Sequence, residues 1–151
     1  MKLRARHACV LLTLAALTGL SGCHSWGFSE PVDPPPPPAQ TVSPSGVRWE
    51  DLRVGEGTEV VAGSRVTVNY TGRLQDGAKF DSSLDRGVPF QFVVGRGSVI
   101  AGWDEGMLGM RVGGTRRMIV PPERAYGSEG RAGVIPPNAT LVLEIELLAI
   151  D

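Results

Sequence analysis

The chain has 151 residues, of which 42% are hydrophobic and 21% charged, and its formal net charge is -1. This length predicts one domain once processed ends are removed, with enough residues to bury a core. From Gly46 onward 12 Lys or Arg stand against 14 Asp or Glu, a net charge of -2. We therefore expect a mixed, solvated surface and no nucleic-acid partner.

The first 22 residues have the pattern of a secretory signal. Three basic residues precede the apolar run Ala8 to Leu20, which is shorter than the roughly 20 residues that a membrane-spanning helix needs. The following "LSGC", Leu20 to Cys23, resembles the bacterial lipobox, in which a small residue precedes a cysteine that becomes acylated. We expect residues 1–22 to be a lipoprotein signal peptide and Cys23 to carry the lipid. A mature lipoprotein cysteine carries more than one acyl chain, so the attachment would be durable.

The residue after the proposed lipid site indicates where in the cell the protein is located. His24 stands where an aspartate retains lipoproteins at the inner membrane of enteric bacteria. We therefore expect a lipid-anchored protein of the bacterial cell envelope, at the outer membrane and facing the periplasm. A plain secretory signal with a chance cysteine is the alternative. The other cysteine, Cys9, lies inside the signal, so no disulfide is expected in the folded part.

Residues 23–45 are predicted to form the acylated cysteine and a tether. Seven of the twelve prolines lie between His24 and Ser45. Polyproline II rises about 3.1 Å per residue, so these 22 residues could reach on the order of 70 Å. A proline-rich motif that a partner recognises is the alternative to a spacer.

Residues 46–151 show mostly strand patterns. "VRWEDLRV" (47–54) is the first candidate, and "RVTVNYTGRL" (65–74) alternates apolar and polar residues, with a turn expected at Asp76 and Gly77. "PFQFVVG" (89–95), "TRRMIVP" (115–121) and "LVLEIELLAI" (141–150) complete the strands.

One segment between these strands has helical spacing. In "SVIAGWDEGMLGM", Ile100, Trp103, Met107 and Met110 recur every three or four residues, and Ser98 is the candidate cap. The pattern predicts an α+β fold, in which an antiparallel sheet of about five strands wraps around one short central helix.

Most polar catalysis is excluded by composition. Both histidines, His7 and His24, precede the predicted domain, so it can hold no histidine-based triad or zinc site. Phosphate-binding and nucleophile-elbow motifs are absent from the sequence. The carboxylate pairs Asp104 with Glu105 and Glu144 with Glu146 are interpreted as solvated. We expect no cofactor and no metal.

The segment from "VNYTGRL" to "LEIELL" resembles the FK506-binding-protein (FKBP) family of peptidyl-prolyl cis/trans isomerases. The motifs "YTG", "FDSS", "VIAGW", "AYG" and "IPPNATL" occur in family order, and the resemblance extends over about Gly46 to Asp151. It implies an isomerase domain over 46–151, proline-containing unfolded or folding polypeptides as partners, and inhibition by FK506 or rapamycin.

This activity fits a site without reactive groups. Rotation about an X–Pro bond passes through a twisted amide, over a barrier of roughly 18–20 kcal/mol. The twisted amide has lost its resonance and is less polar than the planar one. An apolar pocket that removes water from the amide therefore favours the twisted state, and no bond is made or broken.

The resemblance also implies which residues form the pocket. Trp103 would form the floor under the proline ring, Asp81 would accept a hydrogen bond, and the Tyr126 hydroxyl and the Ile100 backbone N–H would each bind a substrate carbonyl. The remaining pocket residues implied are Tyr70, Phe80, Phe90, Val99, Val134, Ile135 and Leu143. The chain departs from the family pattern at Arg131, Ala132, Val134 and Leu143. These departures affect the expected specificity more than the expected activity.

Two other functions remain open from the sequence. A lipid-anchored chaperone or client-binding module with little isomerase activity would use the same apolar pocket. A surface-exposed protein that contacts a host is the second alternative.

Overall fold

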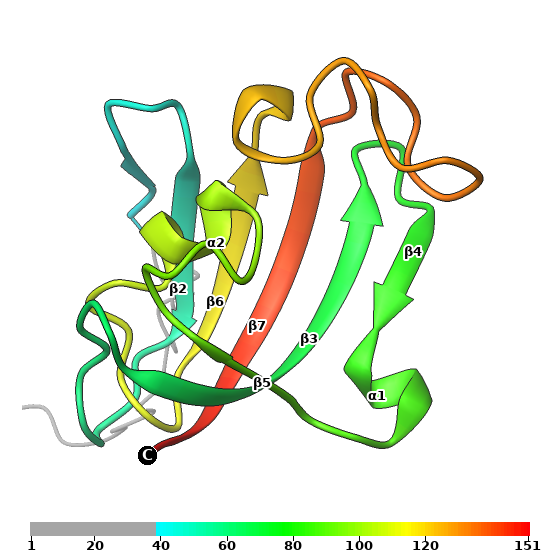
Figure 1. The fold of residues 1–151 in the computed structure, drawn as a ribbon. Coiled ribbons are helices and arrows are strands. Elements are labelled where there is room, and N and C mark those ends of the chain that lie inside the picture. Colours follow the sequence, from blue (N-terminus) through cyan, green and yellow to red (C-terminus); the bar gives the residue numbers. More distant parts are fainter. Residues whose placement is uncertain (1–38) are drawn as a thin grey trace, which may run out of the picture. The chain divides into compact units, whose positions relative to one another are not determined.

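The computed structural model describes residues 39–151, so the predicted signal peptide and Cys23 lie outside the described residues. The described part contains one antiparallel sheet, two short α-helices and a 3-10 helix (Figure 1). The elements are β1 (Thr41–Val42), β2 (Arg48–Arg53), β3 (Arg65–Leu74), β4 (Lys79–Ser82), α1 (Ser83–Arg86), β5 (Phe90–Val93), α2 (Ala101–Gly106), β6 (Thr115–Val120), η1 (Pro122–Arg124) and β7 (Leu141–Ile150). The predicted fold class is confirmed, with seven strands in place of about five.

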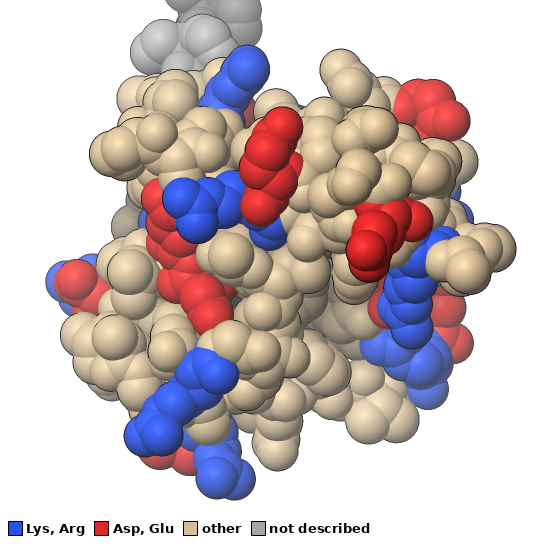
Figure 2. Space-filling model, turned by 45° about the horizontal axis from the view of Figure 1, so that its top comes forward, with Lys and Arg blue, Asp and Glu red and all other residues tan. Residues whose placement is uncertain are grey.

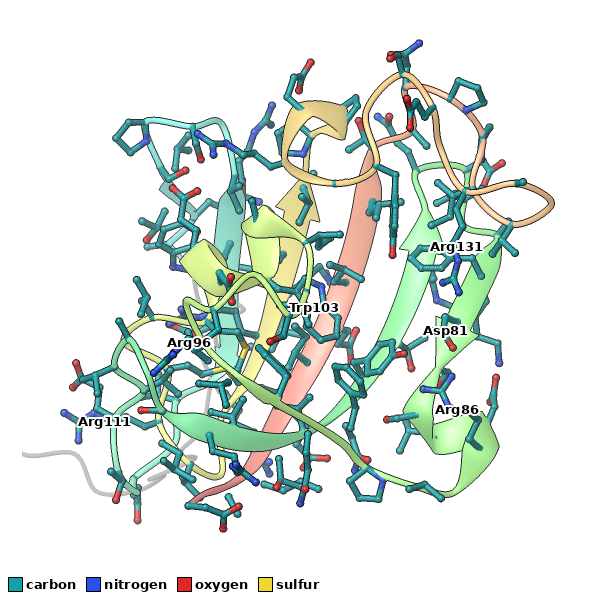
Figure 3. The ribbon with its side chains drawn as sticks, viewed as in Figure 1. Asp81, Arg86, Arg96, Trp103, Arg111 and Arg131 are labelled. Atoms are coloured by element: carbon teal, nitrogen blue, oxygen red, sulfur yellow. The ribbon has the colours of Figure 1, made fainter. Side chains whose placement is uncertain are left out.

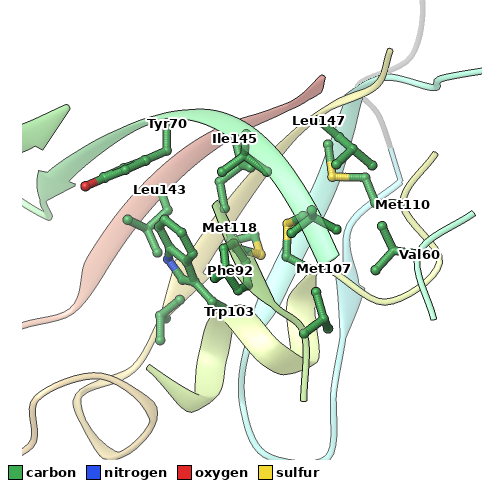
Figure 4. Packing of buried hydrophobic residues seen from close by; sticks show 14 of the residues in the cluster. Val60, Tyr70, Phe92, Trp103, Met107, Met110, Met118, Leu143, Ile145 and Leu147 are labelled. Atoms are coloured by element: carbon green, nitrogen blue, oxygen red, sulfur yellow. The ribbon is translucent and has the colours of Figure 1, made fainter. Parts of the chain in front are cut away.

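The sheet has the order β1-β2-β6-β7-β3-β4, and β5 also pairs with β3. β3 and β7 are ten residues long and run side by side, so that Val68 faces Leu147 and Tyr70 faces Ile145 across the pair. Alternate residues of both strands are buried, as the period of two predicts. One face of the sheet therefore forms the core, which Figure 4 shows.

Helix α2 packs on this apolar face (Figures 1 and 4). A side chain at Gly102 would collide with Val120, and one at Gly106 would collide with Met118, both in β6. The two glycines therefore allow the helix backbone to approach the sheet closely. This approach buries Trp103, which is 5% exposed, between the helix and the sheet.

The start of α2 differs from the prediction. The N-cap is Ile100, in an extended conformation with no side-chain cap, and Ser98 does not cap the helix. Asp104 in the first turn accepts hydrogen bonds from the backbone N–H of Gly95 at 2.8 Å and of Gly97 at 3.0 Å. Its carboxylate thus fixes the loop before the helix, because it takes up backbone donors that would otherwise need water. Asp104 remains partly exposed to solvent, and its support of this loop is a role that the sequence did not predict.

A buried arginine holds the other end of α2. Arg116 in β6 donates to the carbonyl oxygens of Gly106 at 2.7 Å and Leu108 at 3.0 Å, and to both carboxylate oxygens of Asp51. A cation at a helix C-terminus also interacts favourably with the helix dipole. The neighbouring Arg117 pairs with Glu50 instead, so the two arginines lie on opposite faces of β6.

Some residues before Gly46 belong to the sheet. Thr41 and Val42 form β1 against β2, and Ser45 donates a hydrogen bond to Glu105 of α2 at 2.5 Å. The sequence placed these residues in the tether because their composition is that of a linker. The backbone of β1 pairs with the edge of β2 that would otherwise be open. A strand of two residues is too short to show an alternating pattern, so the sequence could not reveal it.

The described surface carries charges of both signs. On the face shown in Figure 2, acidic and basic side chains are interspersed among uncharged residues. Within residues 39–151, no helix is long and apolar enough to cross a membrane.

Candidate active site

A cavity of about 240 Å³ opens between α2, the concave side of the sheet and the loop that follows η1. Nine of the eleven residues that the resemblance implied line this cavity. They are Tyr70, Phe80, Asp81, Phe90, Val99, Ile100, Trp103, Tyr126 and Leu143. Sequence reasoning missed Ser98 and Leu141 as lining residues, and it discussed Arg131 only as a departure in the loop.

Aromatic side chains form the base of the cavity. The Trp103 ring meets Tyr70 edge-to-face at a centroid distance of 4.9 Å and Phe90 at 6.0 Å. Phe92 packs beside Trp103 at 5.5 Å and is 6% exposed, but it does not line the cavity. Phe92 therefore supports the aromatic floor from within the core.

The indole of Trp103 is held by packing alone. Its Nε1 atom is buried and makes no hydrogen bond within residues 39–151. A buried donor without a partner costs about 1–3 kcal/mol, and such groups are uncommon outside functional sites. The burial of a large ring at the base of the cavity must offset this cost.

A polar network lies on the β4 side of the cavity. The Tyr70 hydroxyl donates to Asp81 Oδ2 at 2.6 Å, and Arg86 donates to the Tyr70 hydroxyl at 2.9 Å and forms an ion pair with Asp81. Figure 3 shows Arg86 below Asp81 in this arrangement. The geometry agrees with the predicted role of Asp81 as an acceptor.

Arg86 was not predicted. It follows Asp81 by five residues, and the single turn of α1 brings it back toward that carboxylate. A helix of four residues leaves no periodic signal, and a spacing of five residues is not one at which helical side chains pair, so the sequence contains no indication of this contact.

The network keeps both titratable groups in one protonation state near neutral pH. Burial and the hydrogen bond to Asp81 raise the pKa of Tyr70 above its ordinary value of 10.0. Burial alone would raise the pKa of Asp81, but hydrogen bonds from Tyr70 and Arg86 outweigh it, and the pKa falls below 3.8. Asp81 is thus an ionised acceptor and Tyr70 a neutral phenol.

The loop after η1 delivers Tyr126 and Arg131 to the cavity, but not Val134 or Ile135. Val134 is 43% exposed at the loop tip, and Ile135 is 3% exposed in the core. The backbone N–H of Arg131 donates to the Ile135 carbonyl at 2.8 Å, which closes a tight turn. Ile135 therefore anchors the loop to the core, and neither it nor Val134 lines the cavity as the structure describes it.

No metal chemistry is indicated in the ordered domain. Over residues 39–151, no group of three or more His, Cys, Asp or Glu could hold a metal ion. The cavity presents aromatic and aliphatic surface, one compensated carboxylate, hydroxyl groups and the cation of Arg131.

Comparison with known proteins identifies this arrangement. Residues 56–148 match the family of FKBP-type peptidyl-prolyl cis-trans isomerases. The "FK506-binding protein" of Neisseria meningitidis serogroup B is 53% identical over 70% of this chain and 96% of its own length. The "Peptidyl-prolyl cis-trans isomerase Fkbp12" of Drosophila melanogaster is 50% identical over 70% of this chain and 99% of its own length.

A solved structure agrees with the sequence comparison. That of a peptidyl-prolyl cis-trans isomerase from Pseudomonas syringae pv. tomato superposes with a TM-score of 0.68 at 38% identity, covering 76% of this chain and 82% of that one. The chain belongs to the FKBP family, and its activity is the cis/trans isomerisation of X–Pro peptide bonds. The comparisons give no support to a client-binding module without that activity.

The electrostatics predict a flat pH profile. Asp81 titrates below 3.8 and Tyr70 above 10.0, so neither changes charge between about pH 5 and 9. We expect kcat/KM for a proline peptide to vary less than about twofold over this range, in contrast to the bell shape of acid–base catalysis. Measurement of the catalysed rate in constant-ionic-strength buffers would check this, and a bell-shaped profile centred near neutrality would contradict it.

Proposed function

We propose that the aromatic cavity is the place of catalysis and that it acts by desolvating the amide. The proline ring would lie on Trp103, with Tyr70, Phe80, Phe90, Val99 and Leu143 around it. Water around the planar amide stabilises its polar ground state, so its removal lowers the barrier to the twisted form. Each 1.36 kcal/mol gained in this way accelerates the rotation about tenfold.

Hydrogen-bond donors at the cavity would orient the substrate. Tyr126 lines the cavity from the loop and carries a hydroxyl group, and the backbone N–H of Ile100 precedes the first turn of α2. Each would donate to a substrate carbonyl, while Asp81 stays a hydrogen-bond acceptor. No proton moves in this scheme, which agrees with a cavity that contains no histidine or cysteine.

The same cavity would bind macrolide inhibitors. The relatives in Neisseria meningitidis are named for FK506. We propose that FK506 and rapamycin bind against Trp103 and exclude peptide substrates. Leu143 and the exposed Val134 are the positions at which the affinity would depart from that of other family members.

The observation that carries this proposal is the burial of Trp103 at the base of a cavity lined mainly by aromatic and aliphatic residues. Replacement of Trp103 by Leu removes the flat surface under the proline, and we expect kcat/KM to fall by at least about tenfold. Phe92→Leu is the matched control, because Phe92 is equally buried and touches Trp103 without lining the cavity.

Both substitutions should lower the free energy of unfolding by roughly 1–3 kcal/mol. Urea denaturation would establish that each variant is folded before peptide isomerisation is measured. Similar losses of activity in the two folded variants would show that Trp103 acts only through packing, contrary to the proposal.

We also propose that the enzyme is a lipoprotein of the bacterial cell envelope, with exported proteins as its substrates. The support is the lipobox-like "LSGC" and the proline-rich segment from His24 to Ser45. The acyl chains on Cys23 would fix it to the outer membrane on the periplasmic side, and the proline-rich segment would let the domain reach polypeptides some distance away. Exposure at the cell surface is the competing arrangement.

Substitution of the two cysteines tests the anchor. With Cys23→Ser we expect loss of palmitate labelling in a Gram-negative host and release from the membrane fraction. Cys9→Ser, within the signal itself, should keep both labelling and membrane association. Retention of the Cys23→Ser protein on membranes through a covalent lipid would contradict the proposal.

A further inference from the structure

We infer that Arg131 selects substrates with an acidic residue beside the proline. This inference rests on the proposed binding of substrate in the Trp103 cavity. Arg131 lines that cavity from the loop after η1, and Figure 3 shows it on the same side as Asp81.

The charges at the cavity do not cancel. Among residues 39–151, Asp81 and Arg131 are the charged residues that line it. Asp81 is already paired with Arg86 and accepts a hydrogen bond from Tyr70. Arg131 forms no ion pair within residues 39–151, although the exposed Glu129 lies in the same loop. The cavity opening therefore presents one cation without a carboxylate partner.

The loop holds the backbone of Arg131 at a fixed place beside the cavity. The Arg131 carbonyl accepts the backbone N–H groups of Val134 at 3.0 Å and Ile135 at 2.9 Å, and its own N–H donates to Ile135. Ile135 is buried, and Gly130 has φ of +64° where a side chain would collide with the Ile135 carbonyl. The turn is thus tied to the core, so the backbone of Arg131 loses little entropy when a substrate binds.

A guanidinium group suits a carboxylate ligand. Its donors match the two oxygens of a carboxylate, and it stays charged at every physiological pH. A substrate carboxylate on either side of the proline could approach this exposed group, whereas a lysine there would be repelled. Because the pair is exposed to solvent, we expect a preference of roughly two- to fivefold, which salt weakens.

The test compares peptides that differ by one charge. In Ala-Xaa-Pro-Phe and Ala-Leu-Pro-Yaa, the variable residue is Glu or the isosteric neutral Gln. We expect the purified protein to show a Glu-to-Gln ratio of kcat/KM of about two to five at one or both positions at low salt. The ratio should approach one in 0.5 M NaCl. Using a ratio removes general effects of a substitution on the rate.

Variants assign the preference to Arg131. We expect the Glu-to-Gln ratio of kcat/KM to be near one in Arg131→Gln and below one in Arg131→Glu. In Arg131→Lys, which keeps the positive charge, the ratio should again exceed one. Arg111→Gln is the charge-matched control: Arg111 pairs with Glu59, does not line the cavity, and lies on the other side of the molecule in Figure 3. It should keep the wild-type ratio.

Two results would overturn the inference. A Glu-to-Gln ratio of one at both peptide positions would show that the cation does not contact the substrate. If the Gln peptides are still isomerised in that case, the proposed function stands. A preference that persists in Arg131→Gln would assign it to another residue. Failure to accelerate any of these peptides would instead contradict the proposed function, and this inference with it.

Discussion

The close approach of α2 to the sheet is the constraint on which the site depends. Gly102 and Gly106 face β6 without side chains, so the helix backbone lies near Val120 and Met118. Arg116 ties the end of the helix to the sheet, and Asp104 ties the preceding loop to its beginning. Trp103 lies between these two attachments, and the cavity is the space left above its ring, rimmed by aromatic residues of β3 and β5.

The polar groups of the cavity serve geometry rather than proton transfer. Tyr70, Asp81 and Arg86 satisfy one another, which keeps the carboxylate charged and the phenol neutral. In the reaction itself only a torsion angle changes, so the protein needs a dry surface of fixed shape and a few donors. A set of reactive side chains would add nothing to such a reaction.

The sequence predicted the long strands well because β3 and β7 alternate over ten residues with one buried face. It missed β1, β4 and α1, because these elements of two to four residues are too short to show a clear period. The start of α2 was also misplaced. Ser98 has the residue type of a helix cap, but the N-cap is Ile100, whose backbone is extended. Most of the cavity was predicted through the family motifs. Arg86 and the burial of Ile135 depend on how α1 and the loop fold back, which spacing alone does not determine.

The most direct test of the account is a titration of peptide isomerisation with FK506. The cis-to-trans rate of a Leu-Pro peptide would be followed with the purified protein at increasing drug concentration, together with the intrinsic tryptophan fluorescence, to which Trp26, Trp49 and Trp103 all contribute. If catalysis takes place in the Trp103 cavity, the catalysed rate falls to the uncatalysed one at a single equivalent of drug, in step with the fluorescence change. Catalysis that persists while the drug occupies the Trp103 cavity would place the reaction elsewhere and contradict the central claim.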